Sequence, residues 1–488
     1  MPMTGTTHQI VSTVAILLSL WTGVSTRQPH GPTDPPRLPL TLCHTEALPP
    51  DALCGSYPVP ENRQRPGRSI ALRVVVLPAR LSTGRDAVLA LAGGPGQANS
   101  LAIATGAWIE AVRADRAVVL VDQRGTGQSH PLNCDLQIQS HGAQSLFHDL
   151  FDVGRIAACR DLLSRSADLG QYDLPQAMDD LDDVRAALGY DQFDVLGWSY
   201  GTRSAFVYAR RHPERVRIMV LTSVVTPDFL APLHYARDAQ RALDAVVASC
   251  SDDPTCRAAY PTFGADVAES LRRAAVGVRA VLRDSASQHA DTVVVPPGVF
   301  AEDLRALMYQ PVVLGQLPWL MHLAAGGDFG PLVARMAQFR AGGGFQLPMG
   351  TWFTITCNED VRFIPADKID SLTRGTFLGD YRIRQQQAAC AQWPQTTREA
   401  TDTMVFTVNA PTLIISGRLD PVTPPSWGEH ALRWFAHGRH VVIPGATHTP
   451  RNRCVDRLLA AVIASGSVDE IDRSCVDSVP PLHFMAPP

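Results

Sequence analysis

The sequence predicts an α/β fold: a mostly parallel sheet flanked by helices, with a large helical cap inserted after the sixth strand. Short apolar runs bounded by Gly, Pro or Asp recur along the chain, and helical patterns lie between them. This alternation stops after about residue 227 and resumes near residue 405. Such runs are typical of buried parallel strands, and strands that alternate with helices favour crossover connections.

The apolar runs predict strands at seven places: Ile70–Pro78, Ala87–Ala92, Ala117–Val121, Phe193–Leu196, Arg217–Leu221, Thr412–Ser416 and His440–Pro444. Between them, the patterns of 177–188 and 202–211 predict helices. Within the insertion, helices are expected at 265–282, 299–308 and 331–339. The expected organisation is a core from 43 to 227, a helical cap from 228 to 404 and the rest of the core from 405 to 488.

Composition excludes some classes of protein. The 488 residues carry 43 basic and 47 acidic side chains, which argues against a strongly basic nucleic-acid binder. Hydrophobic residues make up 45% and charged residues 18%, so the chain can bury a large core.

The N-terminus predicts export. The apolar stretch from Ile10 to Val24 is short for a membrane span, and small residues follow it. We expect a signal peptide at 1–26, with an uncleaved anchor as the alternative, and a Pro-rich linker at 27–42. No other stable membrane partner is expected.

The ten cysteines favour disulfides in a secreted or periplasmic protein. Their number is even, and neither C-x-x-C spacing nor neighbouring His residues indicate a zinc site. Pairing each cysteine with its neighbour along the chain is our hypothesis: 43–54, 134–159, 250–256, 357–390 and 454–475. No metal or organic cofactor is implied.

A nucleophile turn is predicted at Ser199. The segment Gly197-Trp198-Ser199-Tyr200-Gly201 matches G-x-S-x-G, with a predicted strand before it and a predicted helix after it. That setting is the one in which a strained turn exposes a serine above a sheet. A serine hydroxyl is a weak nucleophile unless a base takes its proton.

The base and the acid follow later strands. Asp420 lies in the turn after Thr412–Ser416, and His448 lies in the turn after the last strand. The chain order Ser, Asp, His is that of the α/β-hydrolase fold, in which the histidine takes the serine proton and the aspartate orients the imidazole. Asp122 is the second candidate for the acid, but it lies on an earlier strand.

Donors for an oxyanion are expected on both sides of Ser199. The backbone N–H of Tyr200 follows the nucleophile directly. The Gly93-Gly94-Pro95-Gly96 turn should supply the second N–H, from Gly94 first and Gly93 next.

Together these motifs resemble one family. Gly93-Gly94-Pro95-Gly96, the run from Asp122 to Ser129 (DQRGTGQS), the Ser199 turn, the Asp420 turn and the His448 turn occur in its order and spacing. The chain resembles the proline iminopeptidase and tripeptidyl-aminopeptidase-like serine hydrolases across roughly residues 40–480. The resemblance implies an exopeptidase acting on peptides with a free N-terminus.

The same resemblance implies an amine site in the cap. In Cys357-Asn358-Glu359-Asp360, the acid that would bind the substrate ammonium is Glu359, with Asp360 second. A carboxylesterase or amidase with the same triad remains the alternative, because these folds support many chemistries. A non-enzymatic binding protein is the third possibility, which the intact Ser199, Asp420 and His448 disfavour.

Overall fold

The computed structural model describes residues 38–486 apart from 46, 66, 82–83, 103–105, 135, 137–141, 284–289, 343–346 and 397–405. The expected signal peptide and residues 27–37 of the expected linker lie outside the described residues. None of the described helices combines the length and the apolar character needed to cross a membrane.

A nine-stranded sheet forms the centre of the described chain, with strand order β1-β2-β3-β5-β4-β6-β7-β10-β11. The strands from β5 to β11 in that order are parallel, and β1, β2 and β3 join antiparallel at one edge. The strands are β1 (Thr41–Leu42), β2 (Leu53–Pro60), β3 (Ser69–Leu77), β4 (Asp86–Leu91), β5 (Ala117–Val121), β6 (Gln192–Trp198), β7 (Val216–Thr222), β10 (Thr412–Gly417) and β11 (Gly438–Ile443).

All seven predicted strands are present. The strands β1 and β2 were not predicted. β1 lies inside the range expected to be a linker, so that expectation is wrong at its end: the backbone N–H of Leu38 already bonds to the carbonyl of Ala187 in the core. Short edge strands lack the continuous apolar run by which buried strands are recognised.

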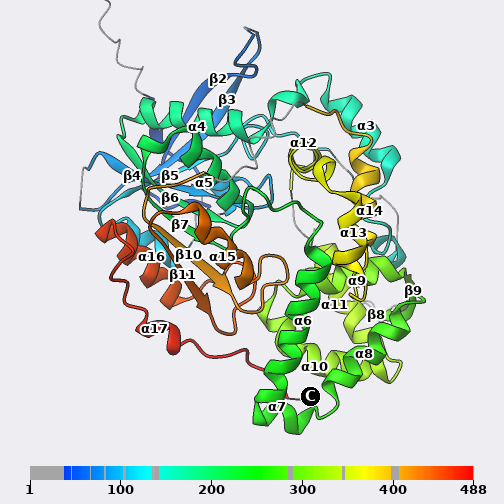
Figure 1. The fold of residues 1–488 in the computed structure, drawn as a ribbon. Coiled ribbons are helices and arrows are strands. Elements are labelled where there is room, and N and C mark those ends of the chain that lie inside the picture. Colours follow the sequence, from blue (N-terminus) through cyan, green and yellow to red (C-terminus); the bar gives the residue numbers. More distant parts are fainter. Residues whose placement is uncertain are drawn as a thin grey trace, which may run out of the picture. The chain divides into compact units, whose positions relative to one another are not determined.

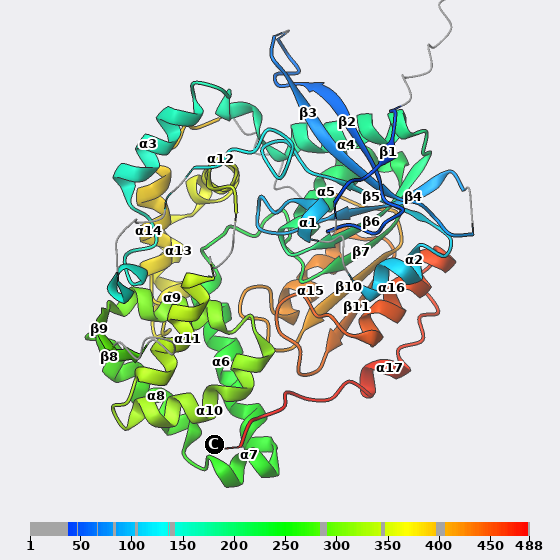
Figure 2. The same ribbon diagram turned by 180° about the vertical axis from the view of Figure 1, so that it is seen from behind.

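Helices cover both faces of the sheet (Figures 1 and 2). One apolar cluster joins one face to α2 and α16, and another joins the opposite face to α4, α5 and α15. The helices before β7 and after β10 are α1 (Asn99–Ala102), α2 (Ala107–Val112), α3 (Val153–Leu163), α4 (Leu174–Leu188), α5 (Tyr200–Arg211), α15 (Pro425–Ala431), α16 (Arg453–Ser465) and α17 (Ser474–Asp477).

The segment between β7 and β10 is mainly helical, and we refer to it as the cap. Its helices are α6 (Tyr235–Asp252), α7 (Pro254–Ala259), α8 (Phe263–Ala274), α9 (Pro297–Leu307), α10 (Pro311–Ala325), α11 (Gly330–Ala341), α12 (Met349–Glu359), α13 (Ala366–Thr373) and α14 (Tyr381–Cys390). Across the described parts of the whole chain, short 3-10 turns occur at Ala143–Leu146, Leu169–Gln171, Pro213–Arg215, Val361–Phe363 and Leu432–Trp434.

The helix expected at 265–282 is wrong in its second half. The helix α8 ends at Ala274, and β8 (Val278–Arg283) pairs antiparallel with β9 (Ala290–Val295). Gly277 has a φ of +92°, a conformation that favours glycine and ends the helix. The next residues alternate between buried and exposed positions, as a strand with one covered face does.

One core segment packs with the cap. The helix α3, which precedes α4 in sequence, lies beside α12 and α14 in both ribbon views (Figures 1 and 2). The ring of Phe151 contacts Trp352 of α12, and Tyr381 of α14 donates a hydrogen bond to Asp149. The segment that carries α3 therefore packs with the cap, although it lies before the boundary expected at residue 227.

The neighbour-pairing hypothesis for the cysteines is confirmed. The disulfides are Cys43–Cys54, Cys134–Cys159, Cys250–Cys256, Cys357–Cys390 and Cys454–Cys475, and no cysteine is free. Disulfides of this density are typical of proteins from oxidising compartments.

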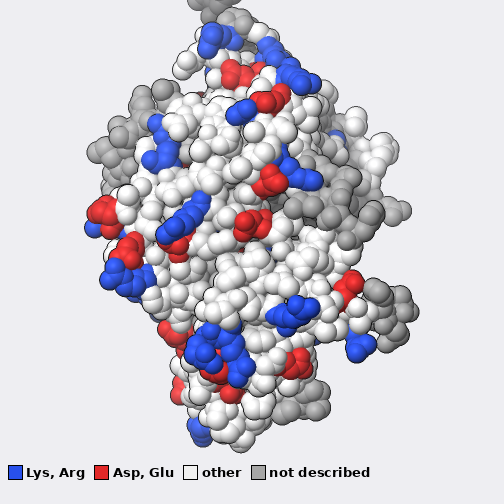
Figure 3. Space-filling model, turned by 90° about the vertical axis from the view of Figure 1, so that its right-hand side faces the viewer, with Lys and Arg blue, Asp and Glu red and all other residues white. Residues whose placement is uncertain are grey.

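On the face shown in Figure 3, acidic and basic side chains are interspersed among the described residues. The described residues of this face form no extended basic area of the kind that binds a polyanion.

Candidate active site

The predicted functional turns meet at one edge of the sheet. Parallel strands end at the same edge, so the loops after β4, β6, β10 and β11 come together there. These loops carry Gly93, Ser199, Asp420 and His448.

Ser199 lies in a strained turn. It has a φ of 53° and a ψ of −124° at the start of α5, a backbone conformation that a serine rarely adopts. Two residues later, a Cβ on Gly201 would lie 2.1 Å from the carbonyl oxygen of Leu91. Only glycine allows α5 to start this close to β4, so the local sequence explains the turn.

The Asp420 and His448 turns are joined by a short hydrogen bond. The Nδ1 atom of His448 lies 2.8 Å from Oδ2 of Asp420. The carboxylate is fully buried, and only 7% of the imidazole is exposed. Burial opposes ionisation of Asp420, but the imidazole and the backbone N–H groups of Val422 and Thr423 outweigh it and keep the pKa of the carboxyl below its ordinary value.

The Ser199 turn and the His448 turn are both hydrogen-bonded to the end of β7. The backbone N–H of Ser199 donates to the carbonyl of Thr222 at 2.9 Å. The backbone N–H of Thr449, next to His448, donates to Oγ of Ser223 at 2.8 Å. Two adjacent residues of β7 and its following turn therefore hold the serine and histidine turns at one place.

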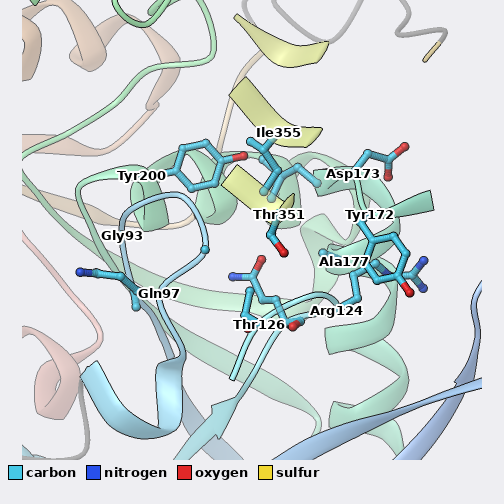
Figure 4. Close-up of a pocket in the computed structure, with 14 residues that line it drawn as sticks. Gly93, Gln97, Arg124, Thr126, Tyr172, Asp173, Ala177, Tyr200, Thr351 and Ile355 are labelled. Carbon is cyan, nitrogen blue, oxygen red and sulfur yellow. Dashed lines mark hydrogen bonds between the residues drawn. The ribbon is translucent and has the colours of Figure 1, made fainter. Parts of the chain in front are cut away.

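The glycine loop after β4 lies against Ser199. A Cβ on Gly93 would stand 3.0 Å from the Cβ of Ser199, so the loop contacts the serine side chain itself. Gly94, the glycine favoured by sequence, is the next residue and has a φ of +111°. Gly93, Gly96 and Gln97 line a pocket together with Tyr200 (Figure 4).

The second candidate for the acid has another role. Asp122 accepts hydrogen bonds from the backbone N–H and the hydroxyl of Ser100 and from the backbone N–H of Gln128. It fastens the loop after β5 and is not bonded to His448.

A residue that the sequence analysis missed completes the acid turn. The hydroxyl of Thr423 donates to Oδ2 of Asp420 at 2.9 Å and lies 3.3 Å from Nδ1 of His448. A threonine three residues after a turn-starting aspartate is a recognisable signal for such a bond.

We expect Thr423→Val to lower kcat roughly 10- to 100-fold, because a hydrogen bond to a charged group contributes about 1.5–3 kcal/mol. Thr423→Ser, which keeps the hydroxyl, should retain most of the rate. Steady-state kinetics of the two variants would test this. Equal values of kcat in both would show that the hydroxyl does not contribute to catalysis.

Another serine, Ser416, is hydrogen-bonded to a histidine that contacts a glutamate. Ser416 Oγ lies 2.9 Å from Nε2 of His440, whose Nδ1 lies 2.6 Å from Glu429. Ser416 is 0% exposed near the end of β10, where no substrate can reach it. Hydrogen-bond connectivity alone therefore does not make a reactive serine, since the strained, accessible turn of Ser199 is also needed.

Glu359 lies behind Tyr200. One carboxylate oxygen accepts a hydrogen bond from the Tyr200 hydroxyl at 2.8 Å, and the other accepts one from the backbone N–H of Leu174 at 3.1 Å. Glu359 is 4% exposed, and Ile355, one turn earlier on α12, lines the pocket beside Tyr200 (Figure 4).

Asp360 is a correction to the sequence analysis. It is 2% exposed and forms an ion pair at 2.7 Å with Arg203, which is itself buried in α5. A buried guanidinium needs this carboxylate as a counter-charge, so Asp360 is not available to a substrate amine.

The described residues contain no group of three or more His, Cys, Asp or Glu that could hold a metal ion. The strained turn of Ser199, a nearby base and backbone N–H donors are suited to acyl transfer.

Comparison with known proteins supports the fold and the class of enzyme. Residues 86–273 match the family described as alpha/beta hydrolase fold, and residues 375–475 match the family described as TAP-like protein. The chain is 27% identical to the serine protease Hip1 of Mycobacterium tuberculosis over 482 residues, which cover 88% of each chain.

This chain is a serine peptidase of the α/β-hydrolase fold. A shorter region of the peptidase is similar to the tripeptidyl aminopeptidase of Streptomyces coelicolor, with 33% identity over 199 residues that cover 37% of this chain and 36% of the relative. Another is similar to the proline iminopeptidase of Neisseria gonorrhoeae, with 29% identity over 107 residues that cover 22% and 24% of the two chains. The family suggested by the sequence motifs is thereby confirmed.

Proposed function

We propose that the peptidase is a secreted serine aminopeptidase that releases an N-terminal residue or short peptide from unblocked peptides. The observation that carries the proposal is the buried Asp420–His448 pair, attached through β7 to the strained turn of Ser199. The relatives named as aminopeptidases support the substrate class, and the five disulfides support export.

The proposed reaction is acyl transfer in two steps. Oγ of Ser199 attacks the scissile carbonyl while Nε2 of His448 takes its proton, and Asp420 stabilises the imidazolium. The backbone N–H groups of Tyr200 and of Gly94 or Gly93 stabilise the oxyanion. His448 then returns the proton to the leaving amine, and the C–N bond breaks. Water, deprotonated by His448, cleaves the acyl ester and regenerates Ser199.

The free N-terminus of the substrate is proposed to bind Glu359. Tyr200 directly follows the nucleophile, and its hydroxyl reaches the Glu359 carboxylate. That carboxylate is therefore one tyrosine side chain away from the Ser199 turn. Such a distance suits an enzyme that cuts close to a bound ammonium, because the substrate amine and the scissile carbonyl are then held together.

Fluorogenic Pro, Ala and tripeptide substrates with free and with acetylated N-termini test the proposal. Turnover of free-amine substrates only would support it and would define the length of the released product. Equal turnover of blocked peptides or of simple esters would contradict it in favour of a carboxylesterase or amidase.

We expect Glu359→Gln to raise KM for free-amine peptides about tenfold while the hydrolysis of a small acyl ester changes little, because a charge-assisted bond is about twice as strong as a neutral one. Glu61→Gln is the matched control. Glu61 is also buried, and it accepts hydrogen bonds from the hydroxyl of Tyr172 and the backbone N–H of Asp168. Equal losses on both substrate types would remove Glu359 from amine binding.

A further inference from the structure

The cap is hydrogen-bonded directly to the turn that carries the proposed base. The hydroxyl of Thr447, the residue before His448, donates to the backbone carbonyl of Met308 at 2.7 Å. Met308 directly follows the last residue of α9, and the side chains of Thr447 and Met308 are both buried. Thr447 thus links the end of a cap helix to the core turn after β11.

Tyr309, the residue after Met308, packs on the imidazole of His448. The ring centroids of Tyr309 and His448 are 4.9 Å apart, with an angle of 66° between the ring planes. This edge-on geometry is a favourable one for an aromatic pair. The contact involves the imidazole itself, in addition to the backbone of its turn.

Buried charges hold Tyr309 in place. Arg305, one turn earlier on α9, donates to the Tyr309 hydroxyl at 3.3 Å, and its guanidinium lies 5.6 Å from the centre of the Tyr309 ring. Glu302 accepts two hydrogen bonds from Arg305 and a third from Arg382 of α14. Burial raises the pKa of the Tyr309 hydroxyl well above its ordinary value, so the ring stays neutral.

The acid turn is attached to the cap as well. The side chain of Leu419, the residue before Asp420, packs within the main apolar cluster of the cap. The hydroxyl of Thr447 also lies 3.3 Å from the carbonyl of Leu419. Acid turn, base turn and the end of α9 therefore form one packed unit.

Hydrogen bonds at Nδ1 alone leave a catalytic imidazole free to tilt. Asp420 holds the ring at Nδ1, and the side-chain torsion that rotates an imidazole has broad energy minima. A second contact on the ring removes that freedom and keeps Nε2 directed at its proton donor. Orientation of this kind lowers the barrier of the chemical step and leaves ground-state binding of the substrate unchanged.

We propose that Tyr309, supported by the Thr447–Met308 hydrogen bond, is a positioning residue by which the cap orients His448 for proton transfer. The inference rests on the proposed function, in which His448 is the base. It extends that function because it makes the cap part of the machinery for the chemical step.

Two measurements on one set of variants test the inference. A fluorophosphonate probe that labels Ser199 reports the fraction of active enzyme from the extent of labelling and the reactivity of the serine from the rate constant. Free-amine fluorogenic peptides report kcat and KM. The variants are Tyr309→Ala, Tyr309→Phe and Thr447→Val.

For Tyr309→Ala we expect the labelling rate constant and kcat to fall about tenfold, with complete labelling and KM within twofold. Tyr309→Phe keeps the ring and should restore both rates. Thr447→Val should show the same pattern with a smaller loss. Tyr381→Ala is the matched control, because this cap tyrosine bonds to Asp149 and should leave both rates unchanged.

Two results would overturn the inference. A higher KM for Tyr309→Ala with an unchanged labelling rate would make Tyr309 a wall of the substrate site. A reduced extent of labelling with an unchanged rate constant would make it a structural residue.

Failure of the proposed function is distinguishable from failure of the inference. If the wild-type chain reacts with the probe but cleaves no free-amine peptide, the aminopeptidase proposal fails, and the labelling rates still decide the role of Tyr309. If the wild-type chain does not react with the probe at all, His448 activates no serine, and both proposals fail.

Discussion

Replacing Ser199 with alanine should lower kcat by about 10⁴-fold or more, with little change in KM. The acyl-enzyme cannot form without Oγ, and the residual rate would come from the oxyanion donors and substrate binding alone. The folded state should be retained, because the bond from the Ser199 backbone N–H to Thr222 does not involve the lost hydroxyl. Peptide hydrolysis, together with the thermal unfolding midpoint, would measure both effects.

Ser416→Ala is the control for this experiment. Ser416 is hydrogen-bonded to a histidine that contacts a carboxylate, but it is buried within β10. We expect this variant to keep most of its activity and to lose some stability, since the His440 ring nitrogen loses its partner. Loss of activity in Ser416→Ala with activity retained in Ser199→Ala would reverse the assignment of the nucleophile.

Asp420→Asn should lower kcat by about 10³–10⁴-fold while preserving the geometry of the turn. The amide can still accept hydrogen bonds from Val422 and Thr423, but it cannot stabilise an imidazolium or hold the correct tautomer of His448. Steady-state kinetics with a free-amine peptide would measure the loss. A variant within tenfold of the wild-type rate would show that another group fulfils the role of the acid.

Asp228→Asn is the matched control for the acid. Asp228 lies 2.9 Å from Nε2 of His430, so it forms an Asp–His pair with a histidine other than His448. If contact with any histidine mattered, both variants would lose activity to a similar extent. We expect only Asp420→Asn to do so, because only that aspartate contacts the imidazole next to the nucleophile turn.

Local signals account for the parts of the site that were predicted. The G-x-S-x-G turn needs glycine because α5 starts against the carbonyl of Leu91. The five consecutive residues of this motif are enough to predict the turn. The disulfide pairs could also be predicted locally, because each joins two cysteines that are neighbours along the chain. Asp420 and His448 could be selected because each comes directly after a recognisable buried strand.

Other features depended on partners distant in sequence. Asp360 was the second candidate after Glu359, and the sequence did not show that folding places Arg203, 157 residues earlier in the chain, beside it. The segment around α3 carried no sign that it would pack on α12 and α14. Tyr309 had no motif at all, and its position next to His448 arises only because α9 ends at the base turn.

The sequence by itself determined the fold class, the strands of the parallel sheet, the disulfide pairs and the residues of the proposed triad. These depend on apolar runs, turn chemistry and chain order, which are local properties of the chain. Only the tertiary structure decided which acid of the cap is committed to an ion pair, which serine is accessible and which cap residues reach the base. Those outcomes depend on burial and on side chains brought together from distant segments, and a linear pattern does not record them.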